Sequence, residues 1–331
     1  MLFLKFFRWL YNPNESDIKK RETPNCMKGI KQLPRKELST YEPNDMWTTA
    51  YHNKGVALSL LNKIDDAITN LNIVTELNPY SLESYLVKGH LFNLQQKYEA
   101  AIKEYKKAIE LDPNNAEAYE YIGKIFYMQK EYEKAIEYFD KSIRIDNKNA
   151  ETHWFKARAL LELGRYEEDI ECSQRAIELD PKSLYYNIQI AAYLKLRRLD
   201  EAITCSQKAI ELDPNNAEAY QQWGNALLKQ EKYEESIECS QKAIELDPNN
   251  AEAYENIGLA LLYQGKYHEA LEFFDNAIEL NPNQARLYHN KSLTLLQLGK
   301  VEKALEFIKK ALQISPNYEK AKILKKHIEK M

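Results

Sequence analysis

The segment KAIELDPNNAEAY occurs three times without change, at residues 107–119, 208–220 and 242–254. Its proline belongs to a longer series, because seven of the eleven prolines follow one another at intervals of 34, 68, 33, 34, 34 and 34 residues. The interval of 68 spans two periods, and Asn147 stands where the missing proline would fall. A period of this length predicts an array of small repeated units that bury their apolar faces against one another. The prolines of the series are Pro79, Pro113, Pro181, Pro214, Pro248, Pro282 and Pro316.

Glycine and alanine follow the same period. With each proline placed at position 32 of its repeat, five glycines fall at position 8 and six alanines fall at position 20. Glycine inside a helix costs roughly 1 kcal/mol relative to alanine, so its recurrence predicts a close approach of two helices. The small residues are Gly55, Gly89, Gly123, Gly224 and Gly258 at position 8, and Ala67, Ala101, Ala135, Ala202, Ala270 and Ala304 at position 20.

Each period contains two stretches of helical apolar spacing, separated by a short polar break such as Gln264-Gly265-Lys266. The second break is Asp-Pro-Asn-Asn, where proline ends the helix. The last asparagine of this turn (Asn115, Asn216, Asn250) stands where a helix N-cap is expected. The sequence therefore predicts a helix-turn-helix unit repeated along the chain.

These residues resemble the tetratricopeptide repeat (TPR) family. The resemblance implies an all-α, right-handed superhelical solenoid, with eight repeats over residues 48–318 and a capping helix at 319–331. The remaining residues, 1–47, are expected to form an apolar N-terminal helix followed by an irregular linker. The expected repeats are 48–81, 82–115, 116–149, 150–183, 184–216, 217–250, 251–284 and 285–318.

The fourth and fifth repeats depart from the pattern. Asp169 stands at the position-20 alanine site, and because a buried, unpaired carboxylate is costly, we expect its side chain to reach solvent. The fifth repeat is one residue short, and we place the gap in the turn Leu196-Arg197-Arg198-Leu199. The alternative is that these two repeats form a hinge that alters the curvature of the array.

Composition and motifs point away from several function classes. The chain carries 46 basic and 50 acidic residues, and its repeat region, with 32 and 42, has a net charge of −10, which disfavours a nucleic-acid partner. Cys172, Cys205 and Cys239 share one repeat position. Equivalent residues of adjacent repeats should lie about 8–10 Å apart, which is too far for a disulfide or a shared metal site. Together with Cys26 these cysteines are expected to be reduced, which suits the cytoplasm. No phosphate-binding loop and no nucleophile motif is present. We therefore expect neither enzyme activity, nor a cofactor, nor a bound metal.

Family resemblance implies that the first helix of each repeat lines a concave groove. The groove positions of repeats 2–4 are aromatic and aliphatic, with a lysine and an arginine beside them, a composition that interface hot spots share. We expect this surface to bind a peptide or helical segment of a partner protein, although the same aromatic rings could instead pack on neighbouring helices. The predicted groove residues are Leu86, Val87, Tyr121, Lys124, Tyr127, Met128, Trp154, Phe155 and Arg158.

Repeats 6–8 offer a second comparison within the family. Some TPR domains hold the C-terminal carboxylate of a chaperone through a clamp of Lys, Asn and Arg side chains. Three positions match that clamp here (Asn225, Asn256, Arg286), while Gln221 and Asn290 replace two of its cations. A chaperone-recruiting adaptor is thus one alternative function, and a regulatory part of a transferase acting in trans is another.

The N-terminal residues MLFLKFFRWLY are apolar but too short to cross a bilayer. Three interpretations stay open for residues 1–11: a helix that docks on the repeats, a membrane-surface or partner anchor, or an export signal. We expect a cytoplasmic scaffold, with an exported or membrane-peripheral protein as the alternative, and the sequence does not indicate an oligomeric state.

Overall fold

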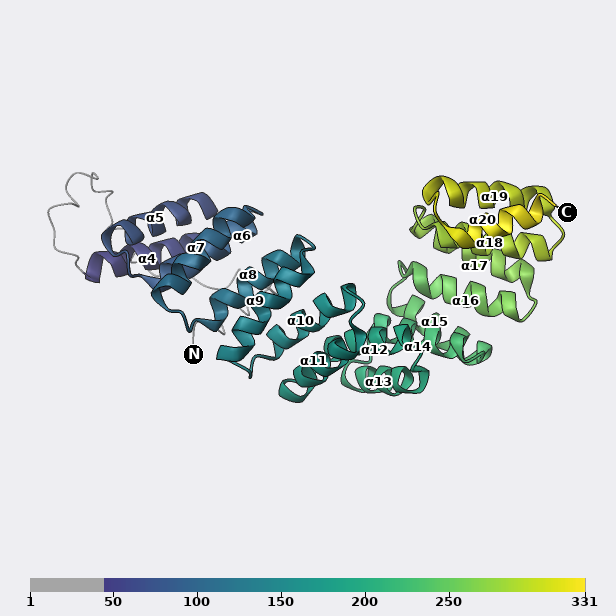
Figure 1. The fold of residues 1–331 in the computed structure, drawn as a ribbon, viewed down its shortest axis with the longest axis horizontal. Helices are drawn as coiled ribbons and strands as arrows, with labels where there is room; N and C mark the ends of the chain where they lie inside the picture. Colours follow the sequence, from purple (N-terminus) through teal and green to yellow (C-terminus); the bar gives the residue numbers. More distant parts are fainter. Residues whose placement is uncertain (1–44, 331) are drawn as a thin grey trace. The chain divides into compact units, whose positions relative to one another are not determined.

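The computed structural model describes residues 45–330, which fall into two units: the first ends at Ser81, and the second begins at Leu82. Throughout the described residues the regular structure is helical, with no strand, which confirms the predicted all-α class. In chain order the helices form pairs joined by short turns, followed by a single last helix (Figure 1). The expected apolar helix at 1–11 lies outside the described residues.

The first unit contains the pair α4 (Asp45–Leu60) and α5 (Ile64–Leu77). Helix α4 begins at Asp45, three residues before the predicted first repeat. Residues 45–47, which were predicted to be irregular, are therefore helical. The second unit holds the first helices α6 (Leu82–Leu94), α8 (Ala116–Met128), α10 (Ala150–Glu162), α12 (Ser183–Lys195), α14 (Ala217–Lys229), α16 (Ala251–Tyr263) and α18 (Ala285–Gln297). Their partners are α7 (Tyr98–Leu111), α9 (Tyr132–Ile145), α11 (Tyr166–Leu179), α13 (Leu199–Leu212), α15 (Tyr233–Leu246), α17 (Tyr267–Leu280) and α19 (Val301–Ile314), and α20 (Glu319–Ile328) closes the array.

The Asp-Pro-Asn-Asn turns cap the helices that follow them, as predicted. The side chain of Asn115 accepts a hydrogen bond from the Ala118 amide at 2.8 Å, and that of Asn250 accepts one from Ala253 at 3.0 Å. Each bond satisfies one of the amide groups that the first turn of a helix leaves unpaired. The repeated segment therefore carries its own helix stop and its own helix start.

The glycines at position 8 allow a large side chain of the partner helix to pack against the backbone. A Cβ atom at Gly89 would lie 2.5 Å from the ring of Tyr105, which is fully buried. Where the first helix carries a larger residue, the partner helix carries a smaller one: Ile190 is matched by Ser206 at the same relative position. Volume is thus exchanged between the two helices in these pairs, whereas α14 and α15 bring together two small residues, Gly224 and Ser240.

The predicted position of the missing residue was wrong. The turn between α12 and α13, residues 196–198, has the same length as the turn 129–131, whereas the turn before α12 contains only residues 180–182. Helix α12 consequently begins at Ser183, one residue before the predicted repeat boundary. Its N-cap is Lys182, for which the described residues contain no side-chain capping bond.

The prediction that Asp169 reaches solvent was also wrong. Its side chain is 0% exposed, as are the alanines at the same position of other pairs. The position lies beside the small residue of the paired helix, since a Cβ atom at Gly55 would be 3.3 Å from the carbonyl oxygen of Ala67.

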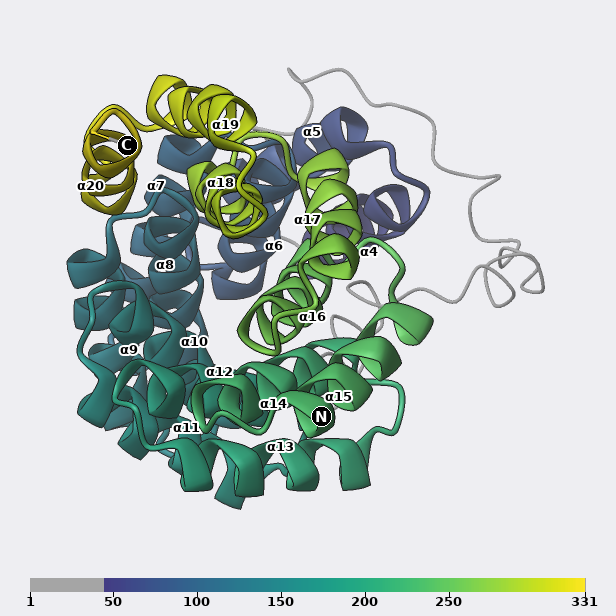
Figure 2. The same cartoon turned by 90° about the vertical axis from the view of Figure 1, so that its right-hand side faces the viewer.

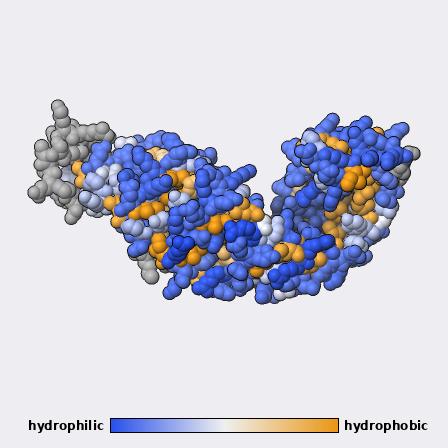
Figure 3. All heavy atoms as spheres, in the orientation of Figure 1, coloured by the Kyte–Doolittle hydropathy of each residue, from blue (hydrophilic) through white to orange (hydrophobic). Residues whose placement is uncertain are grey.

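The last helix, α20, covers the end of the array with Ala321, Leu324 and Ile328, all buried. Lysines 320, 322 and 326 lie on its exposed side. This division agrees with the expected capping role, since a terminal unit of a repeat array needs a polar outer face. Figure 3 shows that the visible surface as a whole is mostly hydrophilic, with separate apolar patches.

Candidate functional site

The first helices of the second unit form its inner face. From α8 onward each first helix contacts the next first helix, whereas the second helices make no comparable contact with one another within residues 82–330. In Figure 2, α8, α10 and α12 accordingly lie inside α9, α11 and α13. Side chains that point away from the second helices therefore line the inner face, which is where the sequence placed the groove residues.

On α6 and α8 the inner face begins with an aromatic cluster. The ring of Tyr121 lies edge-on to His90, with centroids 4.0 Å apart, and stacks on Tyr105 at 5.5 Å. The hydroxyl of Tyr105 is 3.0 Å from Nδ1 of His90. Burial lowers the pKa of His90, although Glu117 acts in the opposite direction. Of the two aliphatic residues predicted beside this cluster, Val87 is buried and Leu86 is partly buried.

Lys124 is held by carboxylates from two helices. Its ammonium contacts Glu120 at 2.5 Å and Glu151 at 2.9 Å, and lies over the rings of Tyr121 and Phe155 at 5.1 and 4.7 Å. Burial by itself lowers the pKa of Lys124, but the two carboxylates outweigh it and the pKa is raised. Lys124 therefore stays charged and connects α8 to α10, so its charge is already balanced before any partner binds.

Arg158 covers three of the predicted aromatic anchors. Its guanidinium carbon lies 4.7 Å from the ring centre of Trp154, 4.9 Å from Tyr127 and 5.8 Å from Phe155. Such cation–π contacts contribute about 0.5–2 kcal/mol each, according to their exposure. The structure thus brings Tyr127, Trp154, Phe155 and Arg158 together in one aromatic cluster, and places the exposed Met128 at the end of α8.

The members of this cluster differ in accessibility. Trp154 is only 9% exposed and packs on Phe155 and on Tyr185 of α12, with centroids 4.8 and 5.6 Å apart. Its Nε1 has no hydrogen-bond partner among the described residues. Trp154 therefore holds α10 to α12, while Tyr127, Phe155 and Arg158, which are partly exposed, offer surface to a partner.

Three of the predicted clamp residues, Asn256, Arg286 and Asn290, are engaged with other groups of the chain. Arg286 contacts Glu252 at 3.2 Å and Glu255 at 3.1 Å, and Asn290 donates to Glu255 at 2.9 Å. Asn256 donates to the backbone carbonyl of Gln221 at 3.1 Å. Burial raises the pKa of Glu255 to about 6, although Arg286 acts in the opposite direction. An incoming carboxylate would have to displace carboxylates of the chain itself.

Family models match most of the array. The model described as "TPR repeat" matches residues 89–130, 191–230 and 224–265, and three models described as "Tetratricopeptide repeat" match 116–149, 150–183 and 249–317. The chain belongs to the tetratricopeptide repeat family. The TPR fold generally serves as a scaffold for protein–protein interactions.

Solved structures agree with this assignment at the level of the fold. The APC/C hetero-tetramer Cut9–Hcn1 matches with a TM-score of 0.63 and 18% identity, over 88% of this chain and 58% of that chain. A tetratricopeptide repeat protein from Parabacteroides merdae ATCC 43184 matches with a TM-score of 0.63 and 20% identity, over 75% of this chain and 99% of that chain. This TPR chain therefore corresponds to little more than half of the Cut9–Hcn1 chain that it matches. No curated protein matches the sequence.

Sequence reasoning missed a polar network of the TPR array. Glu120, only 5% exposed, accepts hydrogen bonds from Asn149 at 2.6 Å and from Thr152 at 3.0 Å, in addition to its contact with Lys124. Asn149 is the N-cap of α10, so one side chain both caps its helix and bonds to the preceding unit. The recurrence of Asn at the cap position was visible in the sequence, but its bond to the neighbouring repeat was not.

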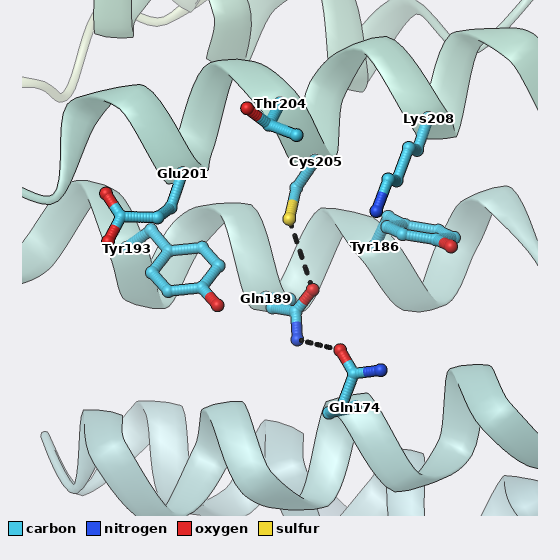
Figure 4. A pocket seen from close by; sticks show the side chains of 8 residues that line it. All are labelled: Gln174, Tyr186, Gln189, Tyr193, Glu201, Thr204, Cys205 and Lys208. Carbon is cyan, nitrogen blue, oxygen red and sulfur yellow. Dashed lines mark hydrogen bonds between the residues drawn. The ribbon is translucent and has the colours of Figure 1, made fainter.

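The three cysteines of the array are unpaired, as expected for equivalent positions of successive repeats. Cys205 donates to Gln189 at 3.2 Å, and Gln189 donates to Gln174 at 3.1 Å, beside a hollow of about 240 Å³ (Figure 4). Burial raises the pKa of Cys172 and Cys205 to about 11 and that of Cys239 to about 12. These thiols are therefore poor nucleophiles at neutral pH, since the thiolate is the reactive form.

In residues 45–330 no three His, Cys, Asp or Glu side chains are grouped so that they could hold a metal ion. Within the same range no helix has the length and apolar character needed to cross a bilayer.

Proposed function

We propose that this TPR protein is a non-catalytic scaffold that holds a segment of a partner protein against the inner face of α8, α10 and α12. The observation that carries the proposal is the cluster of Tyr127, Phe155 and Arg158, which lie within 6.1 Å of one another on adjacent first helices and are partly exposed. Aromatic residues and arginine supply most of the binding energy in many protein interfaces.

The chemistry of the surface supports a protein partner over a nucleic acid. The cation of Lys124 is balanced by two carboxylates, and Glu117, Glu151 and Glu218 lie at the start of α8, α10 and α14. Phosphate backbones bind surfaces with an excess of basic groups, whereas an apolar and aromatic surface fits the side chains of a peptide or helix. We further propose a cytoplasmic location, which the unpaired cysteines support.

The pairing of Arg286 argues against a chaperone-type clamp. Its guanidinium contacts two carboxylates of the chain, one of which, Glu255, is buried. Charge-assisted bonds to a ligand carboxylate would replace bonds that already exist, so the gain in binding free energy is small. The groove of α8–α12 is thus the better candidate.

Site-specific photo-crosslinking in the full chain tests the proposal. A benzophenone amino acid at Met128, exposed at the end of α8, should crosslink a partner in source lysate. The same group at Gln207, exposed on the second helix α13, is the matched control and should not. The Met128 product should disappear when Tyr127→Ala and Arg158→Ala are added. Identical products from both positions, or a Met128 product that survives the double substitution, would refute the groove.

A further inference from the structure

The second helix of the fourth pair carries an acidic side chain where its neighbours carry small ones. Asp169 of α11 is 0% exposed, and neither of its carboxyl oxygens has a hydrogen-bond or ion-pair partner in the described part of the chain. In other pairs the site is held by alanine or, in α15, by Ser236. A carboxylate without a partner in such an enclosed site costs several kcal/mol.

Ser236 indicates how an acidic group can be accommodated there. Its hydroxyl, also fully buried, donates to the backbone carbonyl of Gly224 on the paired helix α14 at 2.8 Å. Ala157 of α10 holds the position that corresponds to Gly224. A carboxylate cannot donate to a carbonyl, but a neutral carboxylic acid has an O–H that can. By this analogy the backbone carbonyl of Ala157 is the acceptor that only the acid form of Asp169 would use.

We propose that Asp169 is a neutral carboxylic acid in the folded array, and that its ionisation opens the α10/α11 pair, which makes this pair a pH-sensitive element of the solenoid.

Groups on the packed helices do not supply a compensating charge. The Cys172 thiol on α11 interacts electrostatically with Asp169, and it is neutral at physiological pH. On α10, Lys156 is paired with Asp140 at 2.7 Å, and the ring of His153 contacts the backbone carbonyl of Asn147 at 3.2 Å. The other titratable groups of the packed helices are Glu151, Arg158 and Glu162 on α10, Tyr166, Glu167, Glu168, Glu171, Arg175 and Glu178 on α11, and Tyr185, Tyr186, Tyr193 and Lys195 on α12.

The direction of the pH effect follows from linkage. Burial raises the pKa of Asp169 from 3.8 to about 8. The folded pair then holds a proton that the opened pair releases, so the stabilisation is complete below about pH 4 and is lost as the pH rises to about 8. One proton released per opening event corresponds to a tenfold rise in the opening equilibrium constant per pH unit within that window.

Hydrogen–deuterium exchange on the full chain tests this proposal, with opening constants corrected for the intrinsic pH dependence of amide exchange. Between pH 5 and pH 7 the opening constant of α10/α11 peptides should rise about 100-fold in the wild type and stay nearly constant in Asp169→Ala, which introduces the alanine that most other pairs carry. Glu167→Gln removes an exposed acid from the same helix and should follow the wild type. Peptides from α13, whose buried residues include neither a histidine nor a carboxyl group, provide the internal reference. Equal pH dependence in wild type and Asp169→Ala would overturn the proposal.

Infrared difference spectroscopy gives a readout that does not depend on unfolding. The folded wild type at pH 6 should show the C=O stretch of a protonated carboxyl group that is absent from Asp169→Asn and Asp169→Ala. Absence of this band from the wild type would refute a neutral Asp169, even if one of the variants failed to fold.

Discussion

A Cβ atom at Gly123 would lie 2.6 Å from the ring of Phe139, so the side chain of one helix occupies the space that the other leaves empty. Phe139 is fully buried, and its ring also stacks on Phe155 of the next unit, with centroids 6.1 Å apart. The contact inside one pair is therefore coupled to the contact between pairs, and through Phe155 to the inner face.

Gly123→Ala should consequently lower the free energy of unfolding by about 1–3 kcal/mol, because the ring must shift from a packed site. The double substitution Gly123→Ala with Phe139→Ser reproduces the combination Ala157 and Ser173 of the next pair. The double variant should lack the steric conflict of Gly123→Ala but should still lose the stabilisation that the buried ring of Phe139 provides. Urea denaturation of the single and double variants, with Phe139→Ser as control, measures the coupling. Strict additivity of the two changes would contradict the contact.

Lys124→Ala should destabilise the contact between α8 and α10. It leaves Glu120, only 5% exposed, with bonds from Asn149 and Thr152 but without its cation. We expect a loss of roughly 1–3 kcal/mol in unfolding free energy. The matched control is Lys141→Ala, which breaks an exposed pair with Glu137 and should change little. If urea denaturation gave the same loss of unfolding free energy for both variants, the burial of Glu120 would not contribute to the effect.

Asp169→Ala should stabilise the protein, and the gain should grow with pH. The variant is relieved of a buried carboxyl group that lacks a partner, and one proton released on unfolding makes the gain grow by about 1.4 kcal/mol per pH unit between about pH 4 and pH 8. Towards pH 4 the gain shrinks, because burial raises the pKa of Asp169 to about 8 and the wild type folds with a neutral group there. Thermal melting of both proteins at pH 4.5, 6 and 8 measures the trend. A gain that is independent of pH, or a variant less stable than the wild type at pH 8, would contradict it.

A free acidic C-terminal peptide should bind weakly, and binding should be insensitive to Arg286→Ala. Arg286 is already paired with Glu252 and Glu255. The double substitution Glu252→Gln with Glu255→Gln releases the cation and should increase affinity, by up to about tenfold for one charge-assisted bond. Fluorescence anisotropy with a labelled peptide distinguishes these cases. Tight wild-type binding that Arg286→Ala abolishes would restore the clamp interpretation.

The repeated fold was predictable because its signals are local. The prolines end helices, the asparagines cap the next ones, and Asn115 and Asn250 make the predicted bonds. The missing residue was misplaced because Leu196-Arg197-Arg198-Leu199 departs from the usual turn sequence, while the true gap at 180–182 preserves an Asp-Pro pair. The unusual residues at 196–198 drew the prediction to that turn, whereas the helix bounds show that the turn at 180–182 is the shortened one.

The candidate site was less predictable because it depends on contacts between repeats. The position of Trp154 marks it as a groove residue, yet Tyr185 of the next unit covers its ring. The position of Arg286 matches a clamp cation, yet the preceding unit supplies Glu252 and Glu255 to neutralise it. Position within a repeat predicts which way a side chain points, and the neighbouring repeat determines how much of it remains accessible.

The identical segments at 208–220 and 242–254 have an evolutionary implication. Each contains the end of one helix, a complete turn and the capped start of the next. Excision of residues 208–241 would join Gln207 to Lys242 and leave one copy of the thirteen-residue segment, with the same turn and the same capping bond. Recombination between such copies therefore alters the number of units in whole steps, so the length of the solenoid can vary among descendants while each hairpin stays intact.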